Sequence, residues 1–127
     1  MTENEIASII VDTAFRIHVD LGPGLFESVY ERIMEAELTK RGLSVDRQKP
    51  IPLIYGDLKF KAGFRADLLV GDKVVVEIKS IEALHPVHKK QVLTYLRFAD
   101  KRLGLLINFN VALIKDGIVR LVNRLKE

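Results

Sequence analysis

Two strongly apolar stretches joined by a short polar turn constrain this chain more than any other feature of its sequence. They read FRADLLV (residues 64–70) and KVVVEIKS (residues 73–80). Side chains alternate between the two faces of a strand, so Glu77 and Lys79 project to one face while the aliphatic side chains beside Glu77 fill the other. Burying ionised groups is costly unless a partner or a metal compensates. We therefore expect either a structural ion pair or a reactive site on this hairpin.

Asp67, on the first of these strands, favours the reactive site. Two carboxylates beside one lysine suit a hard divalent cation and leave the ammonium group for chemistry, as in metal-assisted hydrolysis of phosphodiesters. Such a site requires Asp67 and Glu77 on one face, whereas a two-residue turn would send them to opposite faces. We therefore predict a three-residue loop or a bulge at Gly71, which sets Asp67 opposite Glu77 or Val75.

Length and composition limit the class of protein. A chain of 127 residues is expected to form one domain, residues 1–127, with a core large enough to be stable without disulfides or a structural metal. It contains no cysteine, which excludes disulfides and cysteine zinc sites. The acidic, polar start differs from a signal peptide, and no apolar run approaches the roughly 18 residues of a membrane span. We expect a cytoplasmic protein that is not embedded in a membrane.

The net charge of +3 decides little about partners, but local clusters are more informative. Lys89 and Lys90 follow the charged strand closely, next to His88. A solvated helix face and a phosphate-binding surface are both open interpretations. Helical spacing places His88, Gln91 and Tyr95 on one face that could point at the site. His88, Lys89, Lys90 and Tyr95 are therefore candidate contacts for nucleic acid.

Periodicity and capping signals predict three helices. Thr2 with Glu5 resembles a capping box at the start of the first helix, and the segment 22–24, with two glycines around a proline, ends it. The helices are expected over residues 3–21 and 25–41, and from just after Pro86 to residue 99.

Apolar and β-branched stretches predict the strands of a sheet. An antiparallel meander is expected from residues 44–55, 58–70 and 73–80. Prolines in the first of these favour an edge strand, and Gly63 is expected to bend the second. The apolar run at 103–109 indicates a central strand buried on both faces. Residues 110–114 and 118–122 are expected to form a terminal hairpin. An edge strand in so small a protein would permit a homodimer.

Four polar side chains on the first two helices need an explanation. His18 is expected to be a packing residue near a helix C-terminus. Glu27 and Glu31 lie one turn apart at the edge of the apolar arc of the second helix. For Glu27, a favourable charge at the helix N-terminus and a functional role are both open. Glu37 lies near the middle of that arc, so it is expected to pair with a buried base or to face a cleft.

Three segments together resemble known nucleases. The stretch GLFESVY, residues 24–30, resembles the motif of the GxxExxY proteins, and Asp67 with the EIK tripeptide 77–79 resembles the PD-(D/E)XK nuclease superfamily to which those proteins are assigned. Gln91 and Tyr95 are similar to the Q-x-x-x-Y motif of RecB-like nucleases. The resemblance spans nearly the whole chain, although an alanine precedes Asp67 where the superfamily's name has proline. It implies an α/β, restriction-endonuclease-like core, in which helices flank a mixed central sheet with an antiparallel meander.

The same resemblance implies roles for particular residues. Asp67, Glu77 and the carbonyl of Ile78 would bind Mg²⁺ or Mn²⁺. Lys79 would stabilise developing charge or help to activate water. Glu27 would support the metal or the water from its helix, and Gln91 would orient the site. The leading hypothesis is thus a metal-dependent nuclease acting on DNA. Two alternatives stay open: a non-cleaving module that binds nucleic acid or a protein, and a structural protein in which the three charged side chains form a buried network.

Overall fold

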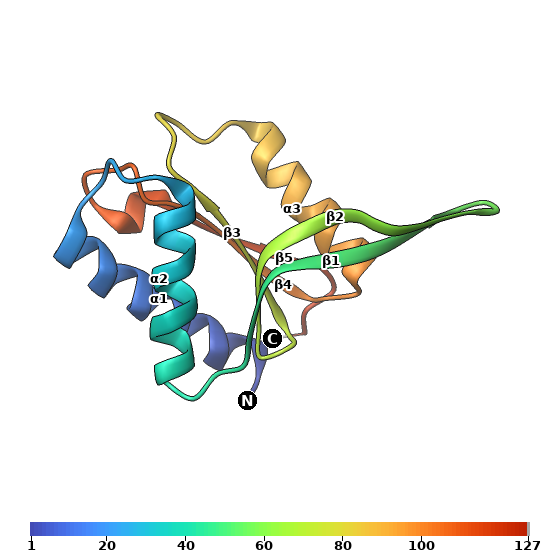
Figure 1. Cartoon of the computed structure of the whole chain (residues 1–127), viewed down its shortest axis with the longest axis horizontal. Helices are drawn as coiled ribbons and strands as arrows, with labels where there is room; N and C mark the ends of the chain where they lie inside the picture. Colours follow the sequence, from blue (N-terminus) through green and yellow to red (C-terminus); the bar gives the residue numbers. More distant parts are fainter. Residues whose placement is uncertain (127) are drawn as a thin grey trace.

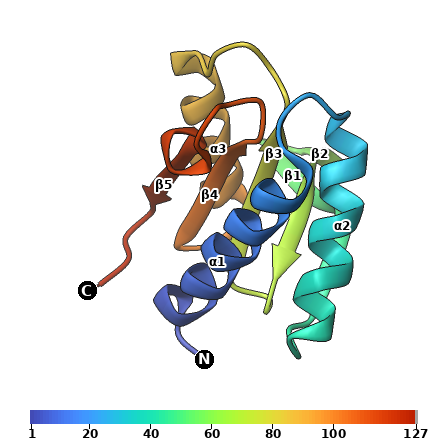
Figure 2. The same ribbon diagram turned by 90° about the vertical axis from the view of Figure 1, so that its left-hand side faces the viewer.

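A five-stranded sheet lies between two helices on one face and one helix on the other (Figure 1 and Figure 2). The computed structural model describes residues 1–126, and Glu127, the last residue of the expected domain, lies outside the described residues. The elements in chain order are α1 (Glu3–Leu21), α2 (Glu27–Lys40), β1 (Val45–Tyr55), β2 (Leu58–Val70), β3 (Val74–Lys79), α3 (Pro86–Ala99), β4 (Leu103–Asn108), the 3₁₀ helix η1 (Ile114–Gly117) and β5 (Ile118–Val122).

The strands follow one another across the sheet in the order β1-β2-β3-β4-β5. The pairs β1–β2, β2–β3 and β4–β5 are antiparallel, whereas β3 and β4 are parallel because α3 crosses over between them. The predicted α/β fold with a mixed sheet, an antiparallel meander and flanking helices is therefore confirmed. The predicted edge position of β1 is also confirmed.

Local signals set the helix boundaries. At the start of α1 the Thr2 hydroxyl accepts from the amide of Glu5 (3.2 Å), and the Glu5 carboxylate accepts from the amide of Thr2 (3.0 Å). The helix begins and ends where the sequence predicted. Helix α3 ends at the predicted residue and starts one residue earlier than predicted, at Pro86. Helix α2 is shorter than expected because Phe26 is extended, with φ −67° and ψ 150°. No helix within residues 1–126 has the length and apolar character needed to cross a bilayer.

The main core lies between the sheet and the pair α1 and α2. In α2, the ring of Tyr30 stacks on Phe109 with centroids 4.3 Å apart. The Tyr30 hydroxyl donates to the carbonyl of Gly22 (2.6 Å) and accepts from the amide of Leu25 (3.2 Å). Tyr30 therefore ties the loop between α1 and α2 to the core. His18 is buried, with Nε2 2.9 Å from the carbonyl of Val111, which agrees with its expected packing role.

One expectation from the sequence is wrong, and a second holds in one of its two forms. The terminal hairpin does not form between residues 110–114 and 118–122, because β5 pairs instead with β4, to which η1 connects it. An apolar run such as β4 needs a strand on each side, and β5 supplies the second one. Glu37 has no buried base as its partner, because its carboxylate lies 3.3 Å from the exposed ammonium of Lys40. The other alternative expected for it holds: Glu37 is half-buried and lines a pocket between α1 and α2.

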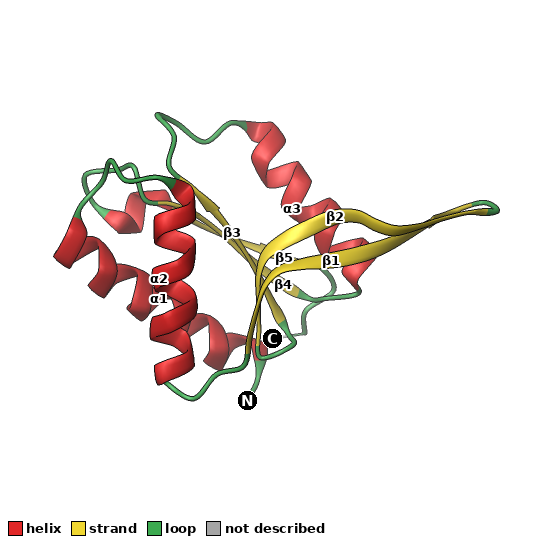
Figure 3. Cartoon of the chain, viewed as in Figure 1, coloured by secondary structure: helices red, strands yellow, loops and turns green. Residues whose placement is uncertain are grey.

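The strands β1 and β2 extend well beyond the sheet as a hairpin that projects from the body of the molecule (Figure 3). Their register shifts between Ile51, which pairs with Phe64, and Leu53, which pairs with Phe60. This irregularity lies beside Gly63, where a bend was expected, and an added Cβ there would approach the Leu53 side chain to 2.7 Å. The projecting hairpin begins next to the charged residues of β2.

Candidate active site

The loop between β2 and β3 decides whether the predicted carboxylates meet. It comprises three residues, 71–73, and the strand pairs next to it run back to Leu68 and Val76. The next position in that register sets Asp67 opposite Glu77 on one face. The predicted odd-length connection is therefore confirmed. Both Gly71 and the residue after it have positive φ, 60° and 56°, and in this region glycine is favoured.

Beyond Leu68 the regular backbone pairing between β2 and β3 stops, and side chains replace it. The amide of Ile78 donates to Asp67 Oδ2 (2.8 Å), and the amide of Asp67 donates to Glu77 Oε1 (3.2 Å). Each carboxylate is therefore held by the backbone of the opposite strand. Figure 1 shows β2 turning away from β3 in this part of the sheet. The two carboxylates lie in the fork between the strands.

Gln48 of β1 and Glu31 of α2 complete the carboxylate cluster, which we define as Glu31, Gln48, Asp67 and Glu77. The Gln48 amide nitrogen donates to Glu31 Oε1 (2.9 Å) and to Asp67 Oδ1 (3.2 Å). Gln48 has φ 53°, a left-handed conformation that costs about 1–2 kcal/mol for a residue with a Cβ. Glu31 also pairs with Arg47, at 3.6 Å. This geometry holds a primary amide between two carboxylates.

Neither Glu31 nor Gln48 has a role that was predicted from the sequence. A signal for Glu31 was present, because it lies one helical turn after Glu27 at the edge of the apolar arc. No local pattern distinguished Gln48, because its importance comes from a backbone conformation and from partners 17 and 19 residues away.

Burial and mutual repulsion shape the electrostatics of the cluster. Glu77 is only 6% exposed. Burial, followed by the charge of Asp67, raises the pKa of Glu77 to about 9, while Lys79 acts in the opposite direction. Burial is also the main reason that the pKa of Glu31 is raised, and that of Tyr95 is raised by burial and then by the charges of Glu77 and Asp67. The site is thus rich in carboxylates and favours a cation.

The predicted site residues on β3 and α2, Lys79 and Glu27, do not have the same relation to the carboxylate cluster. Lys79 is half-buried and shares a face with Glu77. Glu27 does not join the cluster through a direct bond of its own: its Oε2 accepts from the amide of Ser80 (3.2 Å). The hydroxyl of Ser80 donates to the carbonyl of Leu25 (2.6 Å). Glu27 therefore anchors the end of β3, while Glu31 occupies the position beside Asp67.

The predicted site residues on α3 also differ in how close they lie to the carboxylate cluster and in how exposed they are. Tyr95 is half-buried and stacks on Phe64 of β2, with ring centroids 4.1 Å apart. Gln91, one turn earlier, is exposed. The Nδ1 atom of His88 accepts from the amide of His85 (2.9 Å), so it caps the helix start. The two lysines after His88 are exposed. Tyr95 lies near the acids, because burial and then the charges of Glu77 and Asp67 raise its pKa.

A divalent cation suits this donor set. No group of three or more His, Cys, Asp or Glu side chains placed to hold a metal occurs within residues 1–126. Mg²⁺ does not require one, because it is usually bound by one or two carboxylates, with waters and substrate phosphate oxygens completing the shell. Asp67 and Glu77 supply two carboxylates, and a cation would favour the ionised form of Glu77, which burial and then the charge of Asp67 disfavour by raising its pKa.

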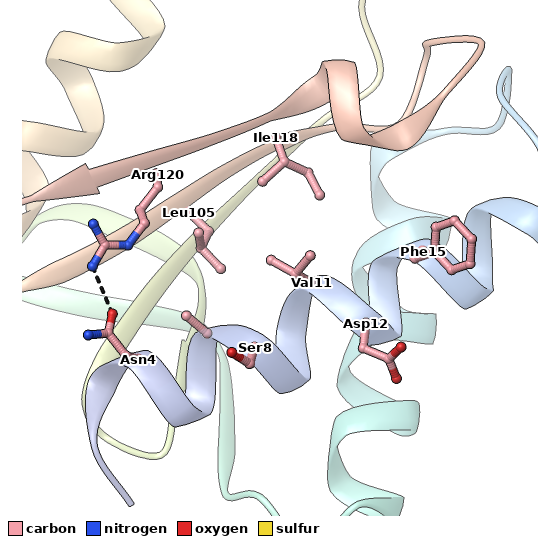
Figure 4. A pocket seen from close by; sticks show the side chains of 9 residues that line it. Asn4, Ser8, Val11, Asp12, Phe15, Leu105, Ile118 and Arg120 are labelled. Carbon is pink, nitrogen blue, oxygen red and sulfur yellow. Dashed lines mark hydrogen bonds between the residues drawn. The ribbon is translucent and has the colours of Figure 1, made fainter.

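A separate groove, with a cavity volume of about 740 Å³, lies between α1 and the strands β4 and β5 (Figure 4). Its walls include the side chains of Val11, Phe15 and Ile118, and a hydrogen bond of 2.7 Å joins Asn4 to Arg120 at one end. None of the residues that line it belongs to the carboxylate cluster. The groove is therefore distinct from the candidate active site.

Comparison with known proteins gives one family. The model described as the PD-(D/E)XK nuclease superfamily matches residues 4–121, which is most of the chain. No curated protein and no solved structure matches it significantly.

Proposed function

The chain belongs to the PD-(D/E)XK nuclease superfamily, and from that premise we propose that it is a metal-dependent nuclease of the GxxExxY type that hydrolyses phosphodiester bonds in DNA. The observation that carries the proposal is the facing pair Asp67 and Glu77, with Lys79 two residues further along the same face. Residues 1–127 would act as a single nuclease-like domain. Its cytoplasmic location and its capacity to form a homodimer stay predictions.

Asp67 and Glu77 would hold Mg²⁺ or Mn²⁺, with the carbonyl of Ile78 as a further oxygen ligand. When bound, such an ion lowers the pKa of a coordinated water and polarises the phosphate. The donor set fits because both carboxylates already face one another and each is oriented by a backbone amide. Oriented ligands lose little freedom on binding an ion, so this arrangement favours a site that is ready to bind.

The remaining residues would act on the substrate or on the ligands. Lys79 brings an ammonium group to the carboxylates, where it can stabilise the negative charge that develops on the phosphoryl oxygens. Gln48 and Glu31 fix the orientation of Asp67 through the bridging amide. Partners of this kind, behind the metal ligands, commonly change metal affinity or activity about 10–100-fold when they are replaced. Glu27 would keep the end of β3 in place through Ser80.

The direct test is cleavage of labelled single-stranded and double-stranded DNA by the purified protein in Mg²⁺ or Mn²⁺. We expect product in either metal, none in EDTA, and a loss of at least 100-fold for Asp67→Asn, Glu77→Gln and Lys79→Ala. Matched controls are Glu82→Gln and Lys115→Ala, which alter exposed side chains of the same types. Cleavage that persists in all three site variants would refute the proposal.

The rival function, a nuclease-fold module that binds without cleaving, gives a different result in the same assay. Such a module would bind DNA or a protein, show no cleavage in any metal, and be indifferent to Asp67→Asn. RNA of the same sequence should be included, because the carboxylate cluster acts on the phosphate and does not itself distinguish the two sugars.

A further inference from the structure

The hairpin that projects from the sheet is attached directly to the candidate active site. We call residues 49–66 the arm. The chain enters the arm immediately after Gln48 and leaves it immediately before Asp67, and these two residues share a hydrogen bond of 3.2 Å. Figure 3 shows the inner part of the arm beside α3 and its outer end extending beyond the helices and the rest of the sheet. A ligand bound along the arm would therefore lie next to the carboxylate cluster at the base of the arm.

The outer half of the arm packs on little of its own chain. Its large apolar side chains are strongly exposed: 65% for Ile54, 77% for Tyr55, 59% for Leu58 and 46% for Phe60. An isolated two-stranded hairpin is marginally stable in water, and contiguous exposed apolar groups mark interaction surfaces. The length and exposure of the arm indicate that it contacts a partner.

The charge of the arm indicates what kind of partner this is. Four basic side chains and one acidic side chain lie on it, all exposed: Lys49, Lys59, Lys61, Arg65 and Asp57. This excess of three equals the net charge of the whole chain, +3. The rest of the protein therefore carries as many acidic as basic side chains, and the positive charge is concentrated on one slender element. Such a distribution complements a polyanion.

The two faces of the arm differ in character. The cross-strand pairs Leu53 with Phe60 and Tyr55 with Leu58 place an apolar, partly aromatic surface on one face. The pair of Ile54 and Lys59 lies on the other face. Lysines contact phosphates, and exposed aromatic rings provide platforms on which unpaired bases stack. A ribbon with both features suits a nucleic-acid strand better than it suits an acidic protein.

The base of the arm is fixed to the body of the protein. The stacked rings of Phe64 and Tyr95, at 4.1 Å, join β2 to α3 close to the acids. This contact holds the inner part of the arm in place relative to the carboxylate cluster, while the side chains of its outer part are exposed to a ligand. The base of the arm is thus held in place beside the carboxylate cluster.

We propose that the arm is the element that binds nucleic acid: its lysines and Arg65 hold the phosphate backbone, Tyr55 and Phe60 stack on unpaired bases, and the bound strand is directed to Asp67 and Glu77. The inference rests on the proposed nuclease function for its direction toward the site. It assigns the substrate contact to a part of the chain other than Lys89 and Lys90 of α3.

The test measures binding separately from cleavage. Fluorescence anisotropy of labelled 20-nucleotide single strands and 20-base-pair duplexes is followed in EDTA with the full chain. The variant Lys59→Glu/Lys61→Glu is compared with Lys115→Glu/Lys126→Glu, which makes the same change in net charge at exposed lysines outside the arm. We expect the arm variant to bind at least 10-fold more weakly and the control to change less than about threefold. The slope of the logarithm of the binding constant against the logarithm of the salt concentration should also become smaller, by the amount that corresponds to about two lost phosphate contacts. Equal weakening in both variants would overturn the proposal.

The aromatic face is tested by Tyr55→Ala, which should weaken binding of the single strand more than binding of the duplex. Equal affinities of this variant and the wild type for the single strand would overturn the stacking assignment. The alternative partner of the arm is a second copy of the chain, and light scattering after size-exclusion chromatography tests for it by measuring the molar mass in solution. A dimer that the arm variant disrupts, with unchanged DNA binding, would overturn the proposal. Loss of DNA binding by the arm variant of a protein that never cleaves DNA would support the arm and refute the nuclease function.

Discussion

Gln48 and Asp67 face each other at the base of a projecting hairpin, and the amide of the first donates to the carboxylate of the second at 3.2 Å. The same amide reaches Glu31 on α2 at 2.9 Å. One side chain in a left-handed conformation therefore links the helix, the arm and the candidate metal ligand.

Replacing Gln48 should damage the site more than the fold. Gln48→Gly removes the amide but relieves the left-handed backbone, so the two effects on the free energy of unfolding, each about 1–2 kcal/mol, should largely cancel. We expect the affinity for Mn²⁺, measured by calorimetry, to fall about 10-fold, with the melting temperature nearly unchanged. Gln48→Asn tolerates the same backbone but is too short to bridge, so it should behave similarly. Wild-type affinity for Mn²⁺ in both variants would contradict this role.

The buried carboxyl of Glu77 should make the metal-free protein less stable as the pH rises. Its pKa is raised to about 9 in the folded state and is near 4.3 in the unfolded chain, so between these values the folded state binds the extra proton. Stability from this group is therefore present at low pH and is lost as the pH rises toward 9, at a rate of up to about 1.4 kcal/mol per pH unit.

The variant Glu77→Gln should remove this slope, because its amide does not ionise. Urea unfolding in EDTA at pH 5.5, 7.0 and 8.5 is the measurement, and the variant should be more stable than the wild type at the highest pH. Glu82→Gln, at an exposed position, serves as the control. If the wild type and Glu77→Gln show the same slope, the buried carboxyl is not the source of the pH dependence.

Binding of a divalent cation should displace the proton held at Glu77. A bound cation favours the ionised carboxylate, so Mn²⁺ binding near pH 7.5 is expected to release up to about one proton. Titration calorimetry in two buffers with different ionisation enthalpies measures this number directly. Glu77→Gln should release none, and chelation by EDTA should reverse the increase in melting temperature that Mn²⁺ causes. A metal that binds without proton release would argue against Glu77 as a ligand.

Tyr30 should contribute to stability and not to chemistry. Its hydroxyl bonds to Gly22 and Leu25, and its ring stacks inside the core. Tyr30→Phe keeps the stack and should lower the free energy of unfolding by about 1–2 kcal/mol, whereas Tyr55→Phe, at a position 77% exposed, should change it little. Cleavage by Tyr30→Phe below its melting temperature should stay within about threefold of the wild type. A large loss of cleavage with unchanged stability would instead make Tyr30 part of the active site.

Features that depend on neighbours in the chain were predictable from the sequence. The bounds of α1 follow from a capping box and a glycine stop, both within three residues of the ends. The odd-length loop before β3 follows from a local condition, that charges on two buried strands must share a face. For Glu37 the helical wheel left two alternatives open, a buried base or a cleft, and the packing of α2 beside α1 decided for the cleft.

Amino-acid order alone determined the three helices, the β1–β3 meander and the facing of Asp67 and Glu77, because each arises from short-range periodicity and turn geometry. Only the tertiary structure decided that β5 pairs with β4, that Glu31 and not Glu27 reaches the acids, and that Gln48 bridges them. These three features depend on which distant segments pack together. Packing is determined by the burial of whole apolar surfaces, and a local sequence pattern does not show which surfaces meet.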